Sequence, residues 1–280
     1  MTNIAGKTVL LTGASGGIGQ FIAHSLARKK ATILAVSRTP EKLAQVCTEI
    51  NELGGKGIPI SFDISQVENL PTLIEKIARF TDSVDILINN AGKEIYQAFH
   101  SYSLNDLQSV LSINLLAAME LTRLLLPSLL AQGSGHIVNI ASLAGKKGHP
   151  YDSIYSASKG GLLMWSDALR QELAGTGVKI SSVCPGYVSS HGMLADTGIP
   201  APRLAGISSP EAVAAAVIRA IEKNQTEVII NSNPLTETLT KLFLAIEQFF
   251  PQWGDTVNSA IGVTRLNQMR IQTQSQKEAS

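Results

Sequence analysis

Two tyrosines and a lysine are spaced four residues apart in the stretch "HPYDSIYSASKGG", residues 149–161. Side chains four apart lie on one face of a helix, so Tyr151, Tyr155 and Lys159 could form a single stripe. An adjacent ammonium favours the phenolate and so lets a tyrosine, with an ordinary pKa of about 10, exchange a proton near neutral pH. Only Tyr155 lies one turn from Lys159. Tyr155 is the predicted proton donor, and Tyr151 is expected to line a substrate pocket or pack on its rim.

A glycine-rich turn, "TGASGGIG" at residues 12–19, follows the apolar run "TVLLT" and opens a helical pattern. Gly13 permits a tight turn, Gly17 removes a side chain where backbone approaches phosphate, and Gly19 allows close helix packing. The free N–H groups of the following helix attract a pyrophosphate. The turn predicts a dinucleotide site whose contacts here are Gly13, Ser15, Gly17, Ile18 and Gly19.

The residues that end the second strand-like run indicate which dinucleotide binds. A site for NAD usually has an acidic residue there, which accepts hydrogen bonds from the ribose hydroxyls. This chain has Ser37 and Arg38 in "AVSRTP". A guanidinium can bind a 2'-phosphate through two charge-assisted hydrogen bonds, so the pattern favours NADP(H). The alternative interpretation of Arg38 is a solvated loop residue.

The elements that must position these residues alternate short apolar runs with helical patterns, from "TVLLT" near the N-terminus to "TEVII" at residues 226–230. Continuous apolar runs are typical of strands covered on both faces. The fold class expected is α/β: a doubly wound parallel sheet of the Rossmann type in three α/β/α layers, with ligands at the carboxyl ends of the strands. The predicted divisions are a catalytic domain at 1–232, an amphipathic helical extension at 233–266 and a disordered tail at 267–280.

Composition excludes several classes of protein. The 280 residues carry a formal net charge of +1, with 16% charged residues, so no nucleic-acid partner is expected. Two cysteines do not form a disulfide framework, and the five scattered histidines have no ligand spacing, so no metal is predicted. No leader or spanning segment is visible, which predicts a cytoplasmic protein. The apolar face of residues 235–253 is expected to pack on protein, with peripheral membrane contact as the alternative.

An ordered set of motifs resembles the short-chain dehydrogenase/reductase family, in its branch with shorter subunits. The resemblance covers about residues 6–230. The motifs are "TGASGGIG", Asp63, "NNAG" at residues 89–92, Asn114, Ser142, "YSASK" at residues 155–159 and "PG" at residues 185–186. It implies that a nicotinamide supplies a hydride while Tyr155 supplies the proton.

The resemblance also implies further roles. The catalytic residues would be Asn114, Ser142, Tyr155 and Lys159, with Asn114 holding a water that relays protons; a structural hydrogen bond is the alternative for this buried amide. Asp63 would contact adenine or cap the next helix, and Asn89 would tie strands together. Ser190 would replace a threonine that usually touches the nicotinamide. The remaining implied cofactor contacts are Asn90, Ala91, Gly92, Tyr155, Lys159, Pro185, Gly186 and Val188.

The leading functional hypothesis is an NADPH-dependent carbonyl reductase, or the reverse alcohol dehydrogenase, acting on a lipophilic ketone such as a steroid or retinoid. The segment after Pro185, rich in Met, Leu, Ile, Pro and Gly, is the expected substrate lid. The alternative is a 3-oxoacyl carrier-protein reductase, whose acidic carrier Lys146 and Lys147 would meet. A third hypothesis is a non-catalytic, NADP-binding redox sensor. Apolar surface on the helix at 104–130 and on that of Tyr155 predicts a homodimer or homotetramer.

Overall fold

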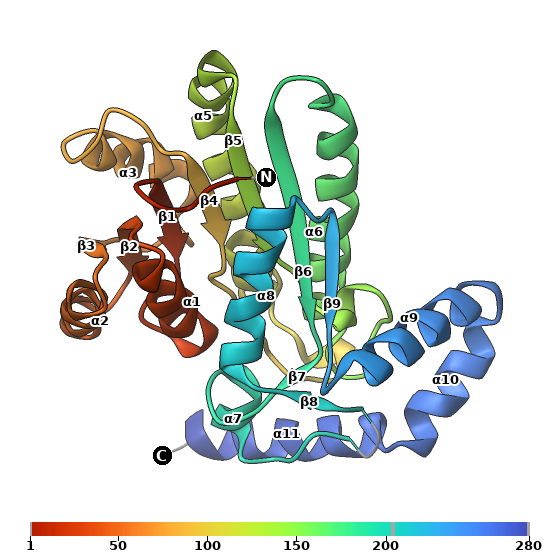
Figure 1. Ribbon diagram of the computed structural model, residues 1–280. Coiled ribbons are helices and arrows are strands. Elements are labelled where there is room, and N and C mark those ends of the chain that lie inside the picture. Colours follow the sequence, from red (N-terminus) through yellow and green to blue (C-terminus); the bar gives the residue numbers. More distant parts are fainter. Residues whose placement is uncertain (1, 203–204, 279–280) are drawn as a thin grey trace.

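The computed structural model describes residues 2–202 and 205–278, which form a parallel sheet between two layers of helices (Figure 1). The sheet has seven strands in the order β3-β2-β1-β4-β5-β6-β9. All of its neighbouring strands are parallel. The strands are β1 (Thr8–Thr12), β2 (Thr32–Ser37), β3 (Lys56–Ser61), β4 (Ile86–Asn89), β5 (Gly135–Ile140), β6 (Val178–Pro185) and β9 (Glu227–Ile230). The predicted doubly wound α/β fold is confirmed.

Alternate residues of each strand face opposite helix layers. In β1, Val9 and Leu11 join one core cluster, whereas Leu10 joins the other. The first cluster packs under α1 (Gly17–Arg28), α2 (Pro40–Glu52) and α8 (Pro210–Lys223). The second lies under α3 (Leu70–Ile77) and α5 (Ala117–Gln132), and α6 (Ser153–Glu172) packs on this same side. Continuous apolar strands are therefore buried on both faces, as expected for a covered parallel sheet.

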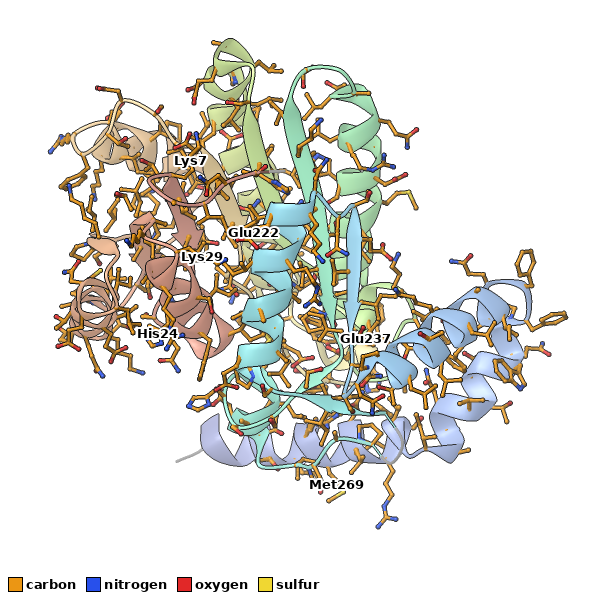
Figure 2. The ribbon with its side chains drawn as sticks, viewed as in Figure 1. Lys7, His24, Lys29, Glu222, Glu237 and Met269 are labelled. Carbon is orange, nitrogen blue, oxygen red and sulfur yellow. The ribbon has the colours of Figure 1, made fainter. Side chains whose placement is uncertain are left out.

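The glycine-rich turn lies at the carboxyl end of β1. From β1 the chain builds the sheet outward to β2 and β3 on one side, and then returns to add β4 on the other side of β1. The glycine-rich turn that follows β1 therefore lies at the topological switch point. A Cβ at Gly19 would lie 2.0 Å from the Gly13 carbonyl oxygen, so only glycine lets α1 begin here. On the same side of the sheet, Lys29 of α1 pairs with Glu222 of the neighbouring helix α8 at 2.6 Å (Figure 2).

The long helix predicted at 104–130 is interrupted. It consists of α4 (Leu104–Leu111), a π-helical turn at Ser112–Leu116, and α5. Asn114 lies in this turn, and π-turns frequently occur at functional sites. Among the described residues, only Leu104–Gln132 has the length and hydropathy of a membrane-spanning helix, and its inner face packs on the sheet through Leu121 and Leu129.

The C-terminal extension forms three helices, α9 (Pro234–Phe249), α10 (Pro251–Ala260) and α11 (Val263–Glu278), which cross the open end of the sheet (Figure 1). The single helix predicted at 235–253 is broken because Pro251 lacks an N–H and restricts the residue before it. Phe243 and Leu244 face the domain. Other apolar side chains of this segment remain exposed, namely Leu235, Leu239, Leu242, Phe249 and Phe250.

The prediction of a disordered tail at 267–280 was wrong for residues 267–278, which belong to helix α11. Asn267 and Arg270 are buried, with exposed fractions of 1% and 0%. Arg270 donates to the Pro200 carbonyl at 2.9 Å and also to Asn267. These two polar side chains of the tail bind residues of the folded domain and do not face solvent. Residues 279–280 lie outside the described part.

Candidate active site

A cavity of about 1040 Å³ opens at the carboxyl ends of the strands, where the fold brings most of the predicted site residues together. The predicted residues that line it are Gly13, Ser15, Gly17, Ile18, Ser37, Arg38, Asp63, Asn90, Ala91, Gly92, Ser142, Tyr155, Lys159, Pro185, Gly186 and Val188. Gly19, Asn114 and Ser190 do not line it. One cavity therefore combines the glycine turn with the Tyr155–Lys159 pair.

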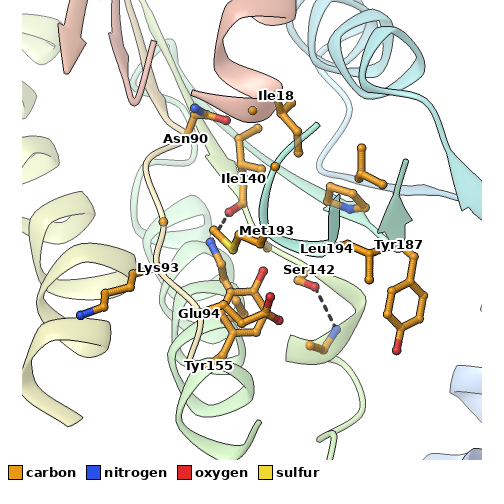
Figure 3. Close-up of a pocket in the computed structure, with 18 of the residues that line it drawn as sticks. Ile18, Asn90, Lys93, Glu94, Ile140, Ser142, Tyr155, Tyr187, Met193 and Leu194 are labelled. Carbon is orange, nitrogen blue, oxygen red and sulfur yellow. Dashed lines mark hydrogen bonds between the residues drawn. The ribbon is translucent and has the colours of Figure 1, made fainter. Parts of the chain in front are cut away.

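Lys159 lies in the interior of α6 and is 3% exposed. Its Nζ donates to the Ile140 carbonyl oxygen at 2.8 Å, at the end of β5. The same Nζ lies 5.6 Å from the centre of the Tyr155 ring, one helical turn away (Figure 3). Burial lowers the pKa of Lys159 to about 8, because an ammonium loses hydration there.

The surroundings of the Tyr155 hydroxyl favour its neutral form. Burial raises its pKa well above the usual value, and the negative charges of Glu94 and Asp152 raise the pKa further. A hydrogen bond with Ser142 acts in the opposite sense. The Lys159 ammonium was expected to favour the phenolate, whereas burial, the largest effect on the pKa of Tyr155, favours the phenol. Tyr155 is therefore poised to donate a proton.

Ser142 follows β5 directly, and its Oγ accepts a hydrogen bond from the Ala144 backbone N–H at 3.1 Å. This bond fixes the hydroxyl at the cavity wall beside Tyr155 (Figure 3). From there the Ser142 hydroxyl can donate to a substrate oxygen as negative charge develops on it. The side chains of Ser142 and Tyr155 thus converge on one point in the cavity.

Tyr151 has a different role from Tyr155. Its backbone has φ of 61°, and its hydroxyl accepts from Gln268 Nε2 of α11 at 2.7 Å. Tyr151 does not line the large cavity. Its hydrogen bond with Gln268 attaches the C-terminal helix to the start of α6.

The side-chain amide of Asn114 is occupied by partners within the chain. Its Oδ1 accepts from the Lys93 N–H at 2.7 Å, and its Nδ2 donates to the Lys93 carbonyl and to Ser158 Oγ, both at 2.9 Å. These bonds tie the segment after Gly92 to α6. The geometry matches the structural alternative for this amide.

The far end of the cavity is polar and basic at the edge of β2. Ser15 Oγ and Ser37 Oγ lie 2.5 Å apart, next to exposed Arg38. Lys42 of α2, which the sequence analysis did not single out, also lines this end. Two cations and two hydroxyls at one end of the cavity fit a phosphate.

The glycine turn is braced by Asn90, whose Nδ2 donates to the Thr12 and Gly13 carbonyls at 3.0 and 3.2 Å. Asn89 donates to Asn139 Oδ1 at 2.8 Å, which joins β4 to β5 as predicted. Asp63 accepts from the Ser65 N–H at 3.0 Å and also lines the cavity, so both roles proposed for it remain open. The glycine-rich turn fits a dinucleotide, and a bound nicotinamide cofactor would supply a hydride.

The lid segment lies over the catalytic centre. It carries β7 (Tyr187–Val188), α7 (Met193–Thr197) and β8 (Ile207–Ser208), with residues 203–204 outside the described part. Ser190 is exposed and has φ of 69°, so the structure does not place it against the cavity. Met193 faces inward instead, with its Cε 3.0 Å from a Cβ built at Gly92.

Sequence reasoning missed a cluster of charged residues behind the substrate side. Glu94 lines the cavity, and Asp152 is 1% exposed behind it. Arg270 of α11 lies between the rings of Tyr96 and Tyr187, at 5.3 and 5.6 Å from their centres. In the sequence, the only local sign of this cluster is the pair of adjacent charges at the end of "NNAGKE". The sequence around Arg270 contains no such sign.

Comparison with known proteins defines the family. The model of the short chain dehydrogenase family matches residues 7–198. A protein named "Ketoacyl reductase HetN" from Nostoc sp. is 56% identical over 97% of this chain and 95% of its own length. A "Dehydrogenase/reductase SDR family protein 7-like" of Anopheles gambiae is 29% identical over 81% of this chain and 76% of its own length.

Two solved structures share the fold. A putative NAD(P)-dependent gluconate 5-dehydrogenase from Beutenbergia cavernae, solved with NADP at low occupancy, has a TM-score of 0.73 and 32% identity, covering 81% of this chain and 96% of its own. A metagenomic short-chain oxidoreductase in complex with NADP has a TM-score of 0.71 and 29% identity, covering 83% and 100%. The fold and site define a nicotinamide-dependent oxidoreductase. The chain belongs to the short-chain dehydrogenase family.

We predict that Tyr155→Phe lowers turnover roughly 100- to 10,000-fold, the range for loss of a positioned general acid. Dinucleotide affinity should change little. Tyr151→Phe is the matched control, and its loss of one hydrogen bond at the rim should leave turnover close to that of the wild type. Steady-state kinetics of both variants measure this, and equal effects would contradict the assignment of Tyr155.

Proposed function

We propose that the protein uses NADPH to reduce the keto group of a lipophilic substrate of the 3-oxoacyl type. The observation that carries this proposal is that Tyr155 and Ser142 line the same large cavity as the glycine-rich turn. Tyr155 donates the proton to the carbonyl oxygen, and Ser142 stabilises the developing charge on that oxygen. Lys159 orients Tyr155 from its fixed position on Ile140.

The substrate end of the cavity suits an acyl chain. The C-terminal extension contributes mostly apolar walls there, with a few side-chain hydroxyls and amides that can orient a polar group. The apolar residues are Leu239, Phe243, Leu244, Val257, Ile261 and Val263. This apolar surface favours the binding of a lipophilic ketone over that of a sugar, because binding of the ketone buries more apolar surface.

Similarity to the ketoacyl reductase supports the 3-oxoacyl class over other lipophilic ketones. That protein matches 97% of this chain, and so includes most of the extension that forms the apolar wall. The gluconate dehydrogenase structure covers 81%. The part of the cavity that selects a substrate is thus represented in the ketoacyl reductase.

A second question is whether the acyl group is bound to an acidic carrier protein or is a smaller thioester. Lys146 pairs with Glu227, and Lys147 pairs with Asp255 at 2.8 Å. Neither lysine is therefore a free cation for an acidic carrier protein. The 3-oxoacyl thioester itself, recognised by the cavity, is the substrate that this arrangement supports.

We predict NADPH consumption with a medium-chain 3-oxoacyl-coenzyme A thioester. Its kcat/KM should exceed that of a chain-length-matched 2-alkanone at least about tenfold, the effect of one or two additional contacts in the cavity. Product analysis should show the 3-hydroxyacyl thioester, and Tyr155→Phe serves as the inactive control. Reduction of the simple ketone with no turnover of the thioester would contradict the proposed substrate class.

We predict a preference for NADPH over NADH that depends on Arg38. Arg38→Asp removes a cation that can bind the 2'-phosphate and adds an acceptor for ribose hydroxyls, so the preference should invert. Titration of both cofactors against the two forms measures this. Arg79→Asp is a matched surface control outside the cavity, and tighter binding of NADH by the wild type would refute the prediction.

We predict that the protein forms a homodimer or homotetramer. Large apolar side chains are exposed along α4, α5 and α6, including Leu104, Leu116, Leu130 and Met164. Such surface is normally covered by a second subunit. Analytical ultracentrifugation should show a species of at least twice the 29.8 kDa chain mass, and a single species at that mass would disprove it.

A further inference from the structure

A second cavity, of about 610 Å³, adjoins the cavity of the candidate active site. Ala144, His149 and Asn258 line both cavities and so mark the boundary at which the two meet. Ala144 lies two positions after Ser142, in the short turn that follows β5. The second cavity therefore begins close to the catalytic residues. Its other lining residues are mostly small or polar, namely Gly145, Gly148, Pro150, Ser153, Ser156, Ala157, Asp255 and Thr264.

Helix α10 forms part of the second cavity and is fixed to the segment that follows Ser142. Lys147 Nζ pairs with Asp255 Oδ1 at 2.8 Å and donates to the Pro251 carbonyl oxygen at 3.3 Å. Asn258 lies three positions after Asp255, and residues three apart share one face of a helix. The ion pair therefore holds the Asn258 side chain at the boundary between the two cavities.

Helix α11 contributes Thr264 to the second cavity and is fixed by its next turn. Asn267, three positions after Thr264, donates from Nδ2 to the Pro150 carbonyl oxygen at 2.8 Å. Ser153 and Asp255 are exposed, so the second cavity opens to solvent beside them. Helices α10 and α11 both lie beyond residue 198, where the match to the family model ends. The second cavity thus depends on the C-terminal extension of this chain.

Two polar side chains at the boundary have no hydrogen-bond partner. Asn258 is 9% exposed, and its side-chain amide makes no hydrogen bond within residues 2–202 and 205–278, which the structure describes. The His149 ring stacks on Tyr187 with 6.3 Å between ring centres, and its nitrogens make no hydrogen bond within the same residues. Burial lowers the pKa of His149 to about 4, so the ring is neutral at physiological pH and can both donate and accept. A buried amide without a partner costs free energy, and a ligand group that pairs with it is therefore favoured.

The chemistry of the second cavity matches a chain that carries neutral amides. Asn258, neutral His149 and the hydroxyls of Ser153 and Thr264 offer both donors and acceptors without net charge. Among the described residues that line this cavity, Asp255 is the only charged one, which disfavours a phosphate or a carboxylate. Pantetheine, the arm of a coenzyme A thioester, is a flexible uncharged chain with amide groups. It has the donors and acceptors that this cavity can pair.

We propose that the second cavity binds the pantetheine arm of the 3-oxoacyl thioester, with the Asn258 amide and the His149 ring bonded to polar groups of that arm. The keto carbon lies at Tyr155 and Ser142, and the acyl chain extends along the apolar wall of α9 and α10. The arm leaves through the second cavity to solvent, where the nucleotide of coenzyme A stands. This assignment rests on the proposed function and names the site that distinguishes a thioester from a simple ketone.

The test compares the pantetheine thioester of a medium-chain 3-oxo acid with the methyl ester of the same acid, each reduced with NADPH. Thr264→Phe places a ring in the second cavity, and Thr264 does not line the first. Only the thioester needs the second cavity, so kcat/KM should fall at least about tenfold for the thioester and change less than about twofold for the methyl ester. Thr256→Phe, at an exposed position of α10 that lines neither cavity, is the matched control and should change neither value.

Asn258→Leu tests the amide itself with a side chain of similar size. Loss of one neutral hydrogen bond should lower kcat/KM for the thioester about three- to tenfold, with the methyl ester nearly unchanged. A loss shared equally by both substrates in either variant would indicate a general defect and overturn the assignment. Unchanged kinetics of the thioester in Thr264→Phe would overturn it as well.

A binding measurement separates failure of this site from failure of the proposed function. The pantetheine thioester of a saturated medium-chain acid has no keto group to reduce, and calorimetry with NADP present measures its Kd without turnover. Thr264→Phe should raise this Kd at least about fivefold, whereas Thr256→Phe should not. A wild type that reduces neither 3-oxo substrate would refute the proposed function, and the Kd values would still decide the site. Equal Kd values in the wild type and Thr264→Phe would refute the site.

Discussion

The ammonium group of Lys159 is buried at the carboxyl end of the sheet and donates to the Ile140 carbonyl at 2.8 Å. A buried cation needs such a partner, because the loss of hydration is otherwise large. The bond fixes α6 against the end of β5. A Cβ at Gly145 would lie 2.6 Å from the Lys159 carbonyl carbon, so the turn after Ser142 also packs directly on α6. Tyr155 and Ser142 take their relative positions from these two contacts.

The features that could be predicted from the sequence are those governed by local rules. Strands such as β1 read as continuous apolar runs because both of their faces are covered. Gly13 is required by a tight turn, and Gly19 is required by the close approach of α1 to that turn. Both glycines lie within the eight-residue motif at 12–19. The choice of Tyr155 over Tyr151 followed from helical spacing to Lys159 alone. The structure places Tyr155 in the cavity and Tyr151 at the rim.

The features that could not be predicted depend on partners far away in the chain. Arg270 contacts Tyr96 across 174 positions by their numbering, and a polar tail in isolation looks solvated. The π-turn at Asn114 is set by hydrogen bonds to Lys93 and Ser158. Glu94 lines the cavity, although its local sequence does not distinguish it from a surface charge. Long-range contacts, rather than periodicity, determine these three features.

Membership of the family defines the chemistry more closely than it defines the substrate, because the two depend on different parts of the chain. The family model ends at residue 198, which includes Ser142, Tyr155 and Lys159 but not the extension. Helices α9 to α11 supply much of the apolar wall, and Arg270 fixes the last of them to Pro200 in the lid. The shape of the cavity thus depends on C-terminal helices that lie beyond the residues matched by the family model.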